Sequence, residues 1–132
     1  MAGELSAPAV MAAVETHMGG PFVWGACDCW SGPCAAFEAL TGRDPLAHLR
    51  GRYDSRFSAA RIIARAGGPR HLAQDCMARA GLRRVAGHAG AIGLFRNGAG
   101  FSLGIIVGPG LMAAKTETGF GFVSEWIDAW AL

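Results

Sequence analysis

The sequence lacks the features of a membrane-spanning or exported chain. No stretch approaches the roughly 18 uncharged apolar residues that a helix needs to cross a bilayer. The first nine residues include Glu4 and contain neither a basic cluster nor an apolar run, so they do not resemble a signal peptide. We therefore expect no membrane span and a chain that is made in a cytoplasm.

Charged residues are also scarce. They make up 17% of the chain, against 52% hydrophobic residues, which is typical of a globular rather than a disordered protein. The sequence has no internal repeat and no segment that resembles a linker. Its 132 residues therefore predict one domain over residues 1–132, built around one core.

The net charge of +2 is small but unevenly distributed. Residues 43–84 contain ten arginines and three aspartates, so this segment has an excess of seven positive charges and the rest of the chain an excess of five negative ones. A basic segment can attract nucleic acid or another anionic partner. Nucleic acid is not expected, because only Tyr53 and Phe57 are aromatic within the segment. Solvated helix faces and ion pairs within the molecule are the favoured interpretation.

The four cysteines do not follow a metal-binding pattern. Cys27, Cys29 and Cys34 match the spacing of no zinc finger or ribbon, and the sequence has no histidine pair at ligand spacing. Because disulfides are rare without secretion, we expect free thiols, no metal and no cofactor. Asp75-Cys76 falls within a helical period, which predicts that Cys76 is a small buried side chain of the core.

Helical periodicity and capping residues dominate the sequence up to residue 81, whereas residues 43–57 read as irregular. We expect four helices: residues 7–18, about 30–41, one capped by Ser58 and ended by Gly67-Gly68, and one that begins at Pro69 and runs to Gly81.

Apolar segments separated by turn sequences follow residue 82 and predict four antiparallel strands in a meander, at residues 91–95, 101–107, 111–116 and 120–124. Asn97-Gly98 is expected to supply the two positive φ values of a tight hairpin turn. Ser124 can cap a last short helix that carries Trp126 and Trp130 on one face. Helices followed by a meander packed on them predict an α+β fold.

The segment Trp24-Gly25-Ala26-Cys27-Asp28-Cys29 carries the main chemical signal. Gly25 permits a sharp loop, and Asp28 can cap the helix that follows. Cys29 then stands at the positive end of that helix, where free backbone amides lower the pKa of a thiol and can hold an oxyanion. A cysteine at a helix start is, taken alone, more often structural. We expect the Cys29 thiol to be presented at this loop-to-helix junction.

The run Pro21–Gly25 followed by Asp28-Cys29 resembles the nucleophile motif of the NlpC-type cell-wall peptidases, a papain-like family. Gly90–Phe95 and Ser102–Gly108 resemble two consecutive core strands of that family. The likeness extends over about residues 20–115. It implies a papain-like NlpC-type fold, with helices packed on a C-terminal meander and with Cys29 at the position of the nucleophile.

Shorter segments resemble a small branch of that superfamily found in tailed phages, prophages and gene-transfer agents. They are Thr41–Pro45, Arg50–Tyr53 and Gly119–Gly121. This resemblance implies other tail-tip or hub proteins as partners, with peptidoglycan as a further partner. It also implies a location in the virion tail after assembly in the bacterial cytoplasm.

The sequence departs from the family pattern at the residues that would perform catalysis. Ser102 stands where the family has its general-base histidine, Ala91 where the preceding strand has an aspartate, and Phe22 where a tyrosine is common. Pro33 lies four residues after Cys29 and would clash with the Cys29 carbonyl in a regular helix, so the helix could instead begin after Cys29, at Ser31.

His88 is the candidate for a replacement base. It precedes the 91–95 strand, and in an antiparallel hairpin the start of one strand lies beside the end of the next. At ~3.3 Å per residue we expect it about 15 Å from Ser102, whereas a general base must lie within about 3 Å of its proton donor. The other histidines, at 17, 48 and 71, are expected at the surface or at helix caps.

Two functional hypotheses remain open, and with them the question whether the chain is an enzyme. The favoured one is a structural tail-tip protein with a degenerate active site, because Ser102 and Ala91 replace the catalytic residues. It would dock through the region around Trp126 and Trp130 and through the arginine-rich segment. The alternative is a cysteine peptidase or amidase that cleaves the peptide stems of peptidoglycan when a genome enters the cell, with Cys29 as nucleophile and an unidentified histidine as base.

Overall fold

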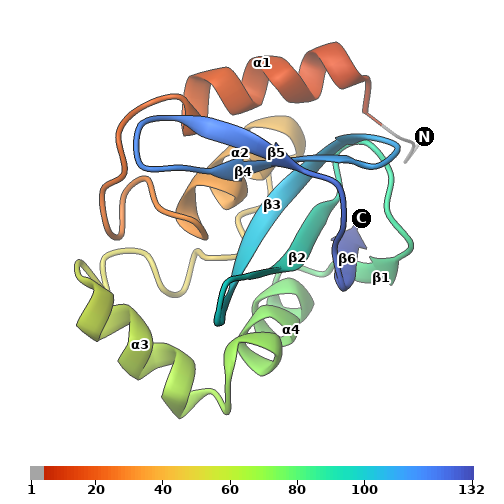
Figure 1. Cartoon of the computed structure of the whole chain (residues 1–132). Helices are drawn as coiled ribbons and strands as arrows, with labels where there is room; N and C mark the ends of the chain where they lie inside the picture. Colours follow the sequence, from red (N-terminus) through yellow and green to blue (C-terminus); the bar gives the residue numbers. More distant parts are fainter. Residues whose placement is uncertain (1–4) are drawn as a thin grey trace.

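The computed structural model describes residues 5–132. The expectation about a leader sequence falls partly on residues 1–4, which lie outside this range. Four helices precede six strands along the chain (Figure 1), which confirms the α+β class. The helices are α1 (Ala7–Met18), α2 (Ser31–Thr41), α3 (Arg56–Arg65) and α4 (Pro69–Arg79). The strands are β1 (Arg83–Val85), β2 (Ile92–Asn97), β3 (Gly100–Gly108), β4 (Leu111–Lys115), β5 (Phe120–Val123) and β6 (Asp128–Ala131).

Helices α1 and α2 follow the expected bounds closely. The side chain of Ser6 accepts a hydrogen bond from the N–H of Ala9 at the start of α1, and Gly42 ends α2 in a left-handed conformation that favours glycine. Both helices pack against each other and against β3. Since α2 begins at Ser31, Cys29 lies just before the helix rather than within it.

Helix α3 begins earlier than the sequence analysis predicts. Ser55 is the N-cap, and Ser58 is the N3 residue that bonds back to it in a capping box. Serine is a common N-cap residue, so the sequence alone does not decide whether Ser55 or Ser58 caps the helix. None of the ten residues of α3 is buried, and among the helices and strands α3 contacts mainly α4.

The sheet contains the expected meander and two further strands. Strands β2 to β5 pair consecutively, and the full order is β1-β6-β2-β3-β4-β5 (Figure 1). The chain therefore crosses from the β5 edge to the other side of β2 before it enters β6. The main core lies between this sheet and helices α1, α2 and α4, and a smaller apolar cluster includes Phe95, Ile106 and Met112.

The predicted C-terminal helix is wrong. All four residues of β6 are buried, and Trp130 pairs with Ile92 on one side and with Arg84 on the other. A strand buried on both faces shows no polar–apolar alternation, so the spacing of Trp126 and Trp130 was misread as a helix face. Trp130 is only 2% exposed and cannot serve as a docking residue.

The β2–β3 turn is displaced by one residue from the expected position. Asn97 pairs with Gly100, so the two-residue loop is Gly98-Ala99, and only Gly98 has a positive φ (63°). A turn with glycine at its first central position needs one such residue rather than two. Asn97 therefore stays in β2, where its side chain is available to the neighbouring strand.

Several charges of the arginine-rich segment are paired within the molecule, as the favoured interpretation expects. The buried carboxylate of Asp128 accepts hydrogen bonds from Arg70 of α4 and Arg84 of β1, which ties β6 to both elements. Asp44 pairs with Arg50 in the irregular segment. Within residues 5–132, no helix has the length and apolar character that crossing a membrane would require.

Candidate functional site

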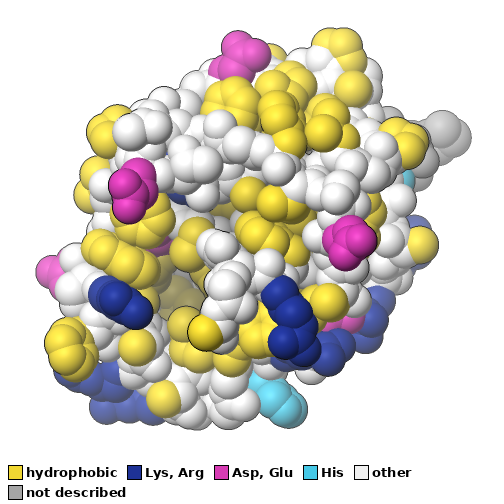
Figure 2. Space-filling view, in the orientation of Figure 1, with side chains coloured by type: hydrophobic (Ala, Val, Ile, Leu, Met, Phe, Trp, Pro, Cys, Tyr) yellow, Lys and Arg dark blue, Asp and Glu magenta, His cyan; other side chains and the backbone are white. Residues whose placement is uncertain are grey.

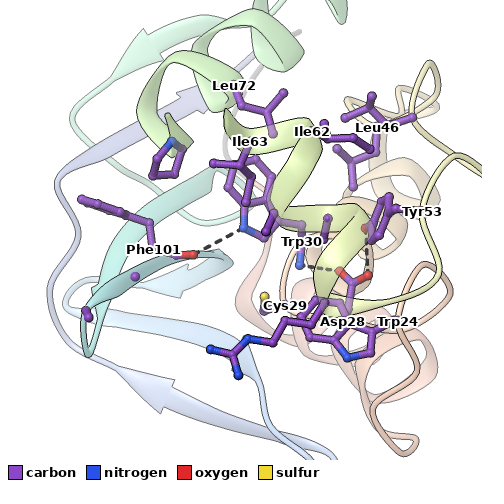
Figure 3. A pocket seen from close by; sticks show the side chains of 17 residues that line it. Trp24, Asp28, Cys29, Trp30, Leu46, Tyr53, Ile62, Ile63, Leu72 and Phe101 are labelled. Carbon is purple, nitrogen blue, oxygen red and sulfur yellow. Dashed lines mark hydrogen bonds between the residues drawn. The ribbon is translucent and has the colours of Figure 1, made fainter. Parts of the chain in front are cut away.

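The carboxylate of Asp28 organises the loop before α2. Its Oδ1 accepts the N–H groups of Trp30 (2.8 Å) and Ser31 (2.7 Å), and its Oδ2 accepts the N–H of Gly25 (2.7 Å) and the hydroxyl of Tyr53 (2.8 Å). Figure 3 shows Tyr53 and Trp30 converging on this carboxylate. The side chain is 1% exposed. One buried group therefore joins the loop, the start of α2 and the irregular segment 43–55.

Glycine is required at position 25 by the same arrangement. Gly25 has a φ of 84°, and a Cβ placed there would overlap the carbonyl oxygen of Tyr53. The sharp loop expected from the sequence is present, and its tightness comes from the approach of segment 43–55.

A buried lysine anchors the beginning of the loop. Lys115 Nζ donates to the carbonyls of Gly20 (2.7 Å), Thr116 (2.8 Å) and Gly119 (2.7 Å), and the N–H of Phe22 donates to a carbonyl in the same β4–β5 connection (2.8 Å). Three carbonyl dipoles satisfy the ammonium group, which is 8% exposed as a residue. No local pattern in the sequence marks this role.

Cys29 and Ser102 lie together in the structure. The N–H of Leu103 donates to the carbonyl of Cys29 (3.3 Å), which holds the loop against β3, and the Ser102 side chain lies near enough to the Cys29 thiol to lower its pKa. Asn97 Nδ2 in turn donates to Ser102 Oγ (3.2 Å). The sequence analysis missed Asn97 because it assigned this residue to the turn.

The expectation that the Cys29 thiol has a lowered pKa is wrong. Burial of the sulfur is the largest effect, and it raises the pKa. Ser102 and the Cys29 backbone lower the pKa by hydrogen bonding, whereas the negative charge of Asp28 raises it. The net result is a raised pKa. The amides at the start of α2 do not activate the sulfur, because Asp28 already accepts those of Trp30 and Ser31. Cys29 is therefore a neutral thiol at pH 7.

Within residues 5–132, no histidine side chain is hydrogen-bonded to Cys29 or Ser102. The N–H of Gly90 donates to the carbonyl of Ile106 (2.8 Å), so the segment that contains His88 lies beside the far end of β3. Ile106 is four residues from Ser102, or about 13 Å along the strand. His48 Nε2 lies 4.0 Å from the sulfur of Cys76 instead. The two others are at the end of α1 (His17) and in the first turn of α4 (His71).

The remaining cysteines are free thiols, as expected. Cys76 is fully buried, as the helical period predicts, and burial raises its pKa to about 12. Cys34 is also fully buried, and burial raises its pKa well above the usual range. Ala91 is a buried core residue. Within residues 5–132, no three side chains of the metal-binding types are grouped.

A cavity of about 520 Å³ opens beside Cys29. It lies between the Cys29 loop, the β2–β3 hairpin end, α3 and the start of α4, and Figure 2 shows it as a hollow walled mainly by hydrophobic side chains. The labelled side chains in Figure 3 include its apolar walls: Trp24, Trp30, Leu46, Ile62, Ile63, Leu72 and Phe101.

Comparison with known families matches residues 6–132 to the family described as "Domain of unknown function (DUF6950)". No curated protein and no solved structure matches the chain.

The role of Asp28 predicts that Asp28→Asn lowers the free energy of unfolding by about 2–4 kcal/mol, because an amide cannot accept all four buried donors. Urea denaturation followed by tryptophan fluorescence measures the change. The matched control is Asp75→Asn, which removes a half-exposed carboxylate paired only within α4 and with His48, and which should cost less than about 0.5 kcal/mol. Equal losses in both variants would contradict the central role of Asp28.

The raised pKa of Cys29 predicts slow alkylation. Thiolate is the reactive form, so at pH 7 the folded protein should react with iodoacetamide at Cys29 more slowly than the same protein in concentrated urea, and its rate should reach half-maximum at a higher pH. Peptide mass spectrometry measures both rates. Ser102→Ala should move the midpoint further upward, because it removes a hydrogen bond that lowers the pKa. If Cys29 were labelled faster in the folded protein than in urea at pH 6, its pKa would not be raised by folding.

Proposed function

The chain belongs to the DUF6950 family, and we propose that it is a structural component of a phage-like tail, with an NlpC-type cysteine-peptidase fold and a degenerate active site. Its partners in this proposal are other tail-tip or hub proteins of the particle. Two observations support the proposal, the chemistry around Cys29 and the arrangement of the elements that hold it, and a resemblance of short segments to tail-associated proteins adds to them.

The contact between Cys29 and Ser102 carries the proposal. A cysteine peptidase needs an imidazole to take the thiol proton, and a serine hydroxyl is not basic enough to do so at neutral pH. The Ser102 oxygen also already accepts a hydrogen bond from Asn97, which reduces its basicity further. With the pKa of Cys29 raised, the site has a nucleophile position without an ionised nucleophile.

The arrangement of elements supports kinship with the NlpC type. A cysteine immediately before a helix lies against an antiparallel sheet, beside the strand whose family counterpart carries the catalytic histidine. Two of the residues that differ from the family pattern are buried: Ser102 lies in β3, and Ala91 lies just before β2. This combination is the one expected of a peptidase scaffold that has lost its base.

The segments that resemble tail-associated proteins also hold the site together. Within Thr41–Pro45, Asp44 pairs with an arginine of the segment Arg50–Tyr53, and Tyr53 donates to Asp28. A likeness concentrated in residues with such contacts favours a shared local structure. Docking to tail partners would use Trp126, Ile127 and Leu132 of the C-terminal region, since Trp130 is buried.

One observation favours an active cysteine peptidase or amidase as the second candidate. Cys29 lines an open cavity rather than being sealed in the core, so a substrate carbonyl could reach the sulfur. In that case Cys29 would attack a peptidoglycan stem peptide, and peptidoglycan would be the polymeric partner.

The structural role predicts no hydrolysis. Purified wild type and Cys29→Ala should both leave peptidoglycan intact, as measured by new amino groups released from purified cell walls. Ser102→His should restore the imidazole and raise the alkylation rate of Cys29 at pH 6 about tenfold for each unit by which it lowers the thiol pKa. Release of amino groups by wild type but not by Cys29→Ala would overturn the structural role in favour of the enzyme.

The tail assignment predicts that the chain is a stoichiometric part of particles. Particles purified from producing cells by density-gradient centrifugation should contain the chain at a constant ratio to the tail proteins, as quantified by mass spectrometry. Cys29→Ala should be incorporated at the same ratio, because the thiol has no assembly role. Recovery of the chain only in the soluble fractions, away from the particles, would exclude the tail assignment.

A further inference from the structure

We propose that the cavity beside Cys29 binds one alkyl chain that ends in an anionic group, of the type of a medium-chain carboxylate. The alkyl chain would lie between α3 and the body of the domain, with the anionic group at Arg56. This binding site goes beyond the structural role proposed above and does not depend on it, because no bond to Cys29 is made or broken.

Helix α3 points to a missing apolar partner. None of its residues is buried, yet Ala59, Ile62 and Ile63 line the cavity. In an amphipathic helix the apolar face normally packs against a core, and burial of that face supplies most of the helix's stability. Here the apolar face borders about 520 Å³ of open space, which is within the range of small-molecule sites. An apolar ligand would supply the contacts that the fold leaves unmade.

The cavity walls offer few free hydrogen-bonding groups. Both oxygens of Asp28 are occupied by four donors, and Trp30 Nε1 donates to the carbonyl of Phe101 (3.4 Å). Among residues 5–132, every buried side-chain nitrogen or oxygen has a partner. A peptide segment brings N–H and C=O groups, and each one that is buried against the apolar walls without a partner costs about 1–3 kcal/mol. A hydrocarbon chain brings none.

The charge at the cavity selects an anionic end group. Arg56 is the only cationic side chain of the lining, and it has no ion-pair partner among the described residues. Arg61 and Arg65 add two further positive charges on α3, which contains no acidic residue. Asp28 is the only acid of the lining, and its oxygens are already hydrogen-bonded. An anion at the mouth would therefore meet a positive field.

Calorimetric titration with hexanoate, octanoate and decanoate below their micelle concentrations tests the site. Affinity should rise by up to about fourfold for each added methylene group that is buried. Decyltrimethylammonium, with the same chain length and the opposite charge, should bind at least tenfold more weakly than decanoate.

Two matched variants of α3 locate the site. Ala59→Phe fills the cavity and should reduce decanoate affinity at least tenfold, whereas Ala64→Phe, at an exposed position outside the lining, should leave it unchanged. Arg56→Gln should weaken decanoate binding and bring it close to that of decanol. Circular dichroism melting curves check that each variant is folded.

Three outcomes would overturn the site. The first is an affinity that does not rise with chain length, and the second is an equal loss in Ala59→Phe and Ala64→Phe. The third is binding to vesicles of anionic phospholipid without binding to monomeric decanoate, which would identify a membrane surface rather than a single chain as the partner. None of these outcomes bears on hydrolysis or on incorporation into particles, so this inference and the structural role can fail separately.

Discussion

The buried carboxylate of Asp28 is the interaction on which the candidate site depends. It accepts hydrogen bonds from Gly25, from the first turn of α2 and from Tyr53 in a segment 25 residues away. Without it, four donors would lose their acceptor, and the loop that carries Cys29 would keep its anchors at Lys115 and Leu103 but lose its links to α2 and to Tyr53. The position of the Cys29 thiol beside β3 therefore depends in part on the hydrogen bonds that satisfy the buried Asp28 carboxylate.

The same interaction decides the chemistry of the thiol. Backbone amides at a helix start can stabilise either a carboxylate or a thiolate. In this protein the amides of Trp30 and Ser31 donate to the carboxylate of Asp28. Burial is the largest cause that raises the pKa of Cys29, and the nearby negative charge of Asp28 raises it further. In an active site an imidazolium would offset this charge, but a hydroxyl at position 102 cannot.

The cavity and the thiol are separable features of the site. The walls of the cavity come mostly from the irregular segment 43–55 and from α3 and α4, whereas the thiol belongs to the loop before α2. A scaffold can therefore lose its chemistry and keep a binding site, because apolar contact with a ligand needs no proton transfer. Helix α3 is the element that would respond to an occupant, since it borders the cavity and none of its residues is buried.

The sequence by itself determined the elements whose signals are local. Periodicity and capping residues gave α1, α2, α4 and the meander, and the loop before Cys29 could be read from its glycine and aspartate. Only the tertiary structure decided the placement of β6, whose burial on both faces erases any alternation, and the direction of the Cys29 pKa. That pKa depends mainly on how deeply the folded chain buries the sulfur, and also on the approach of Ser102, so it is decided by contacts between residues far apart in the chain.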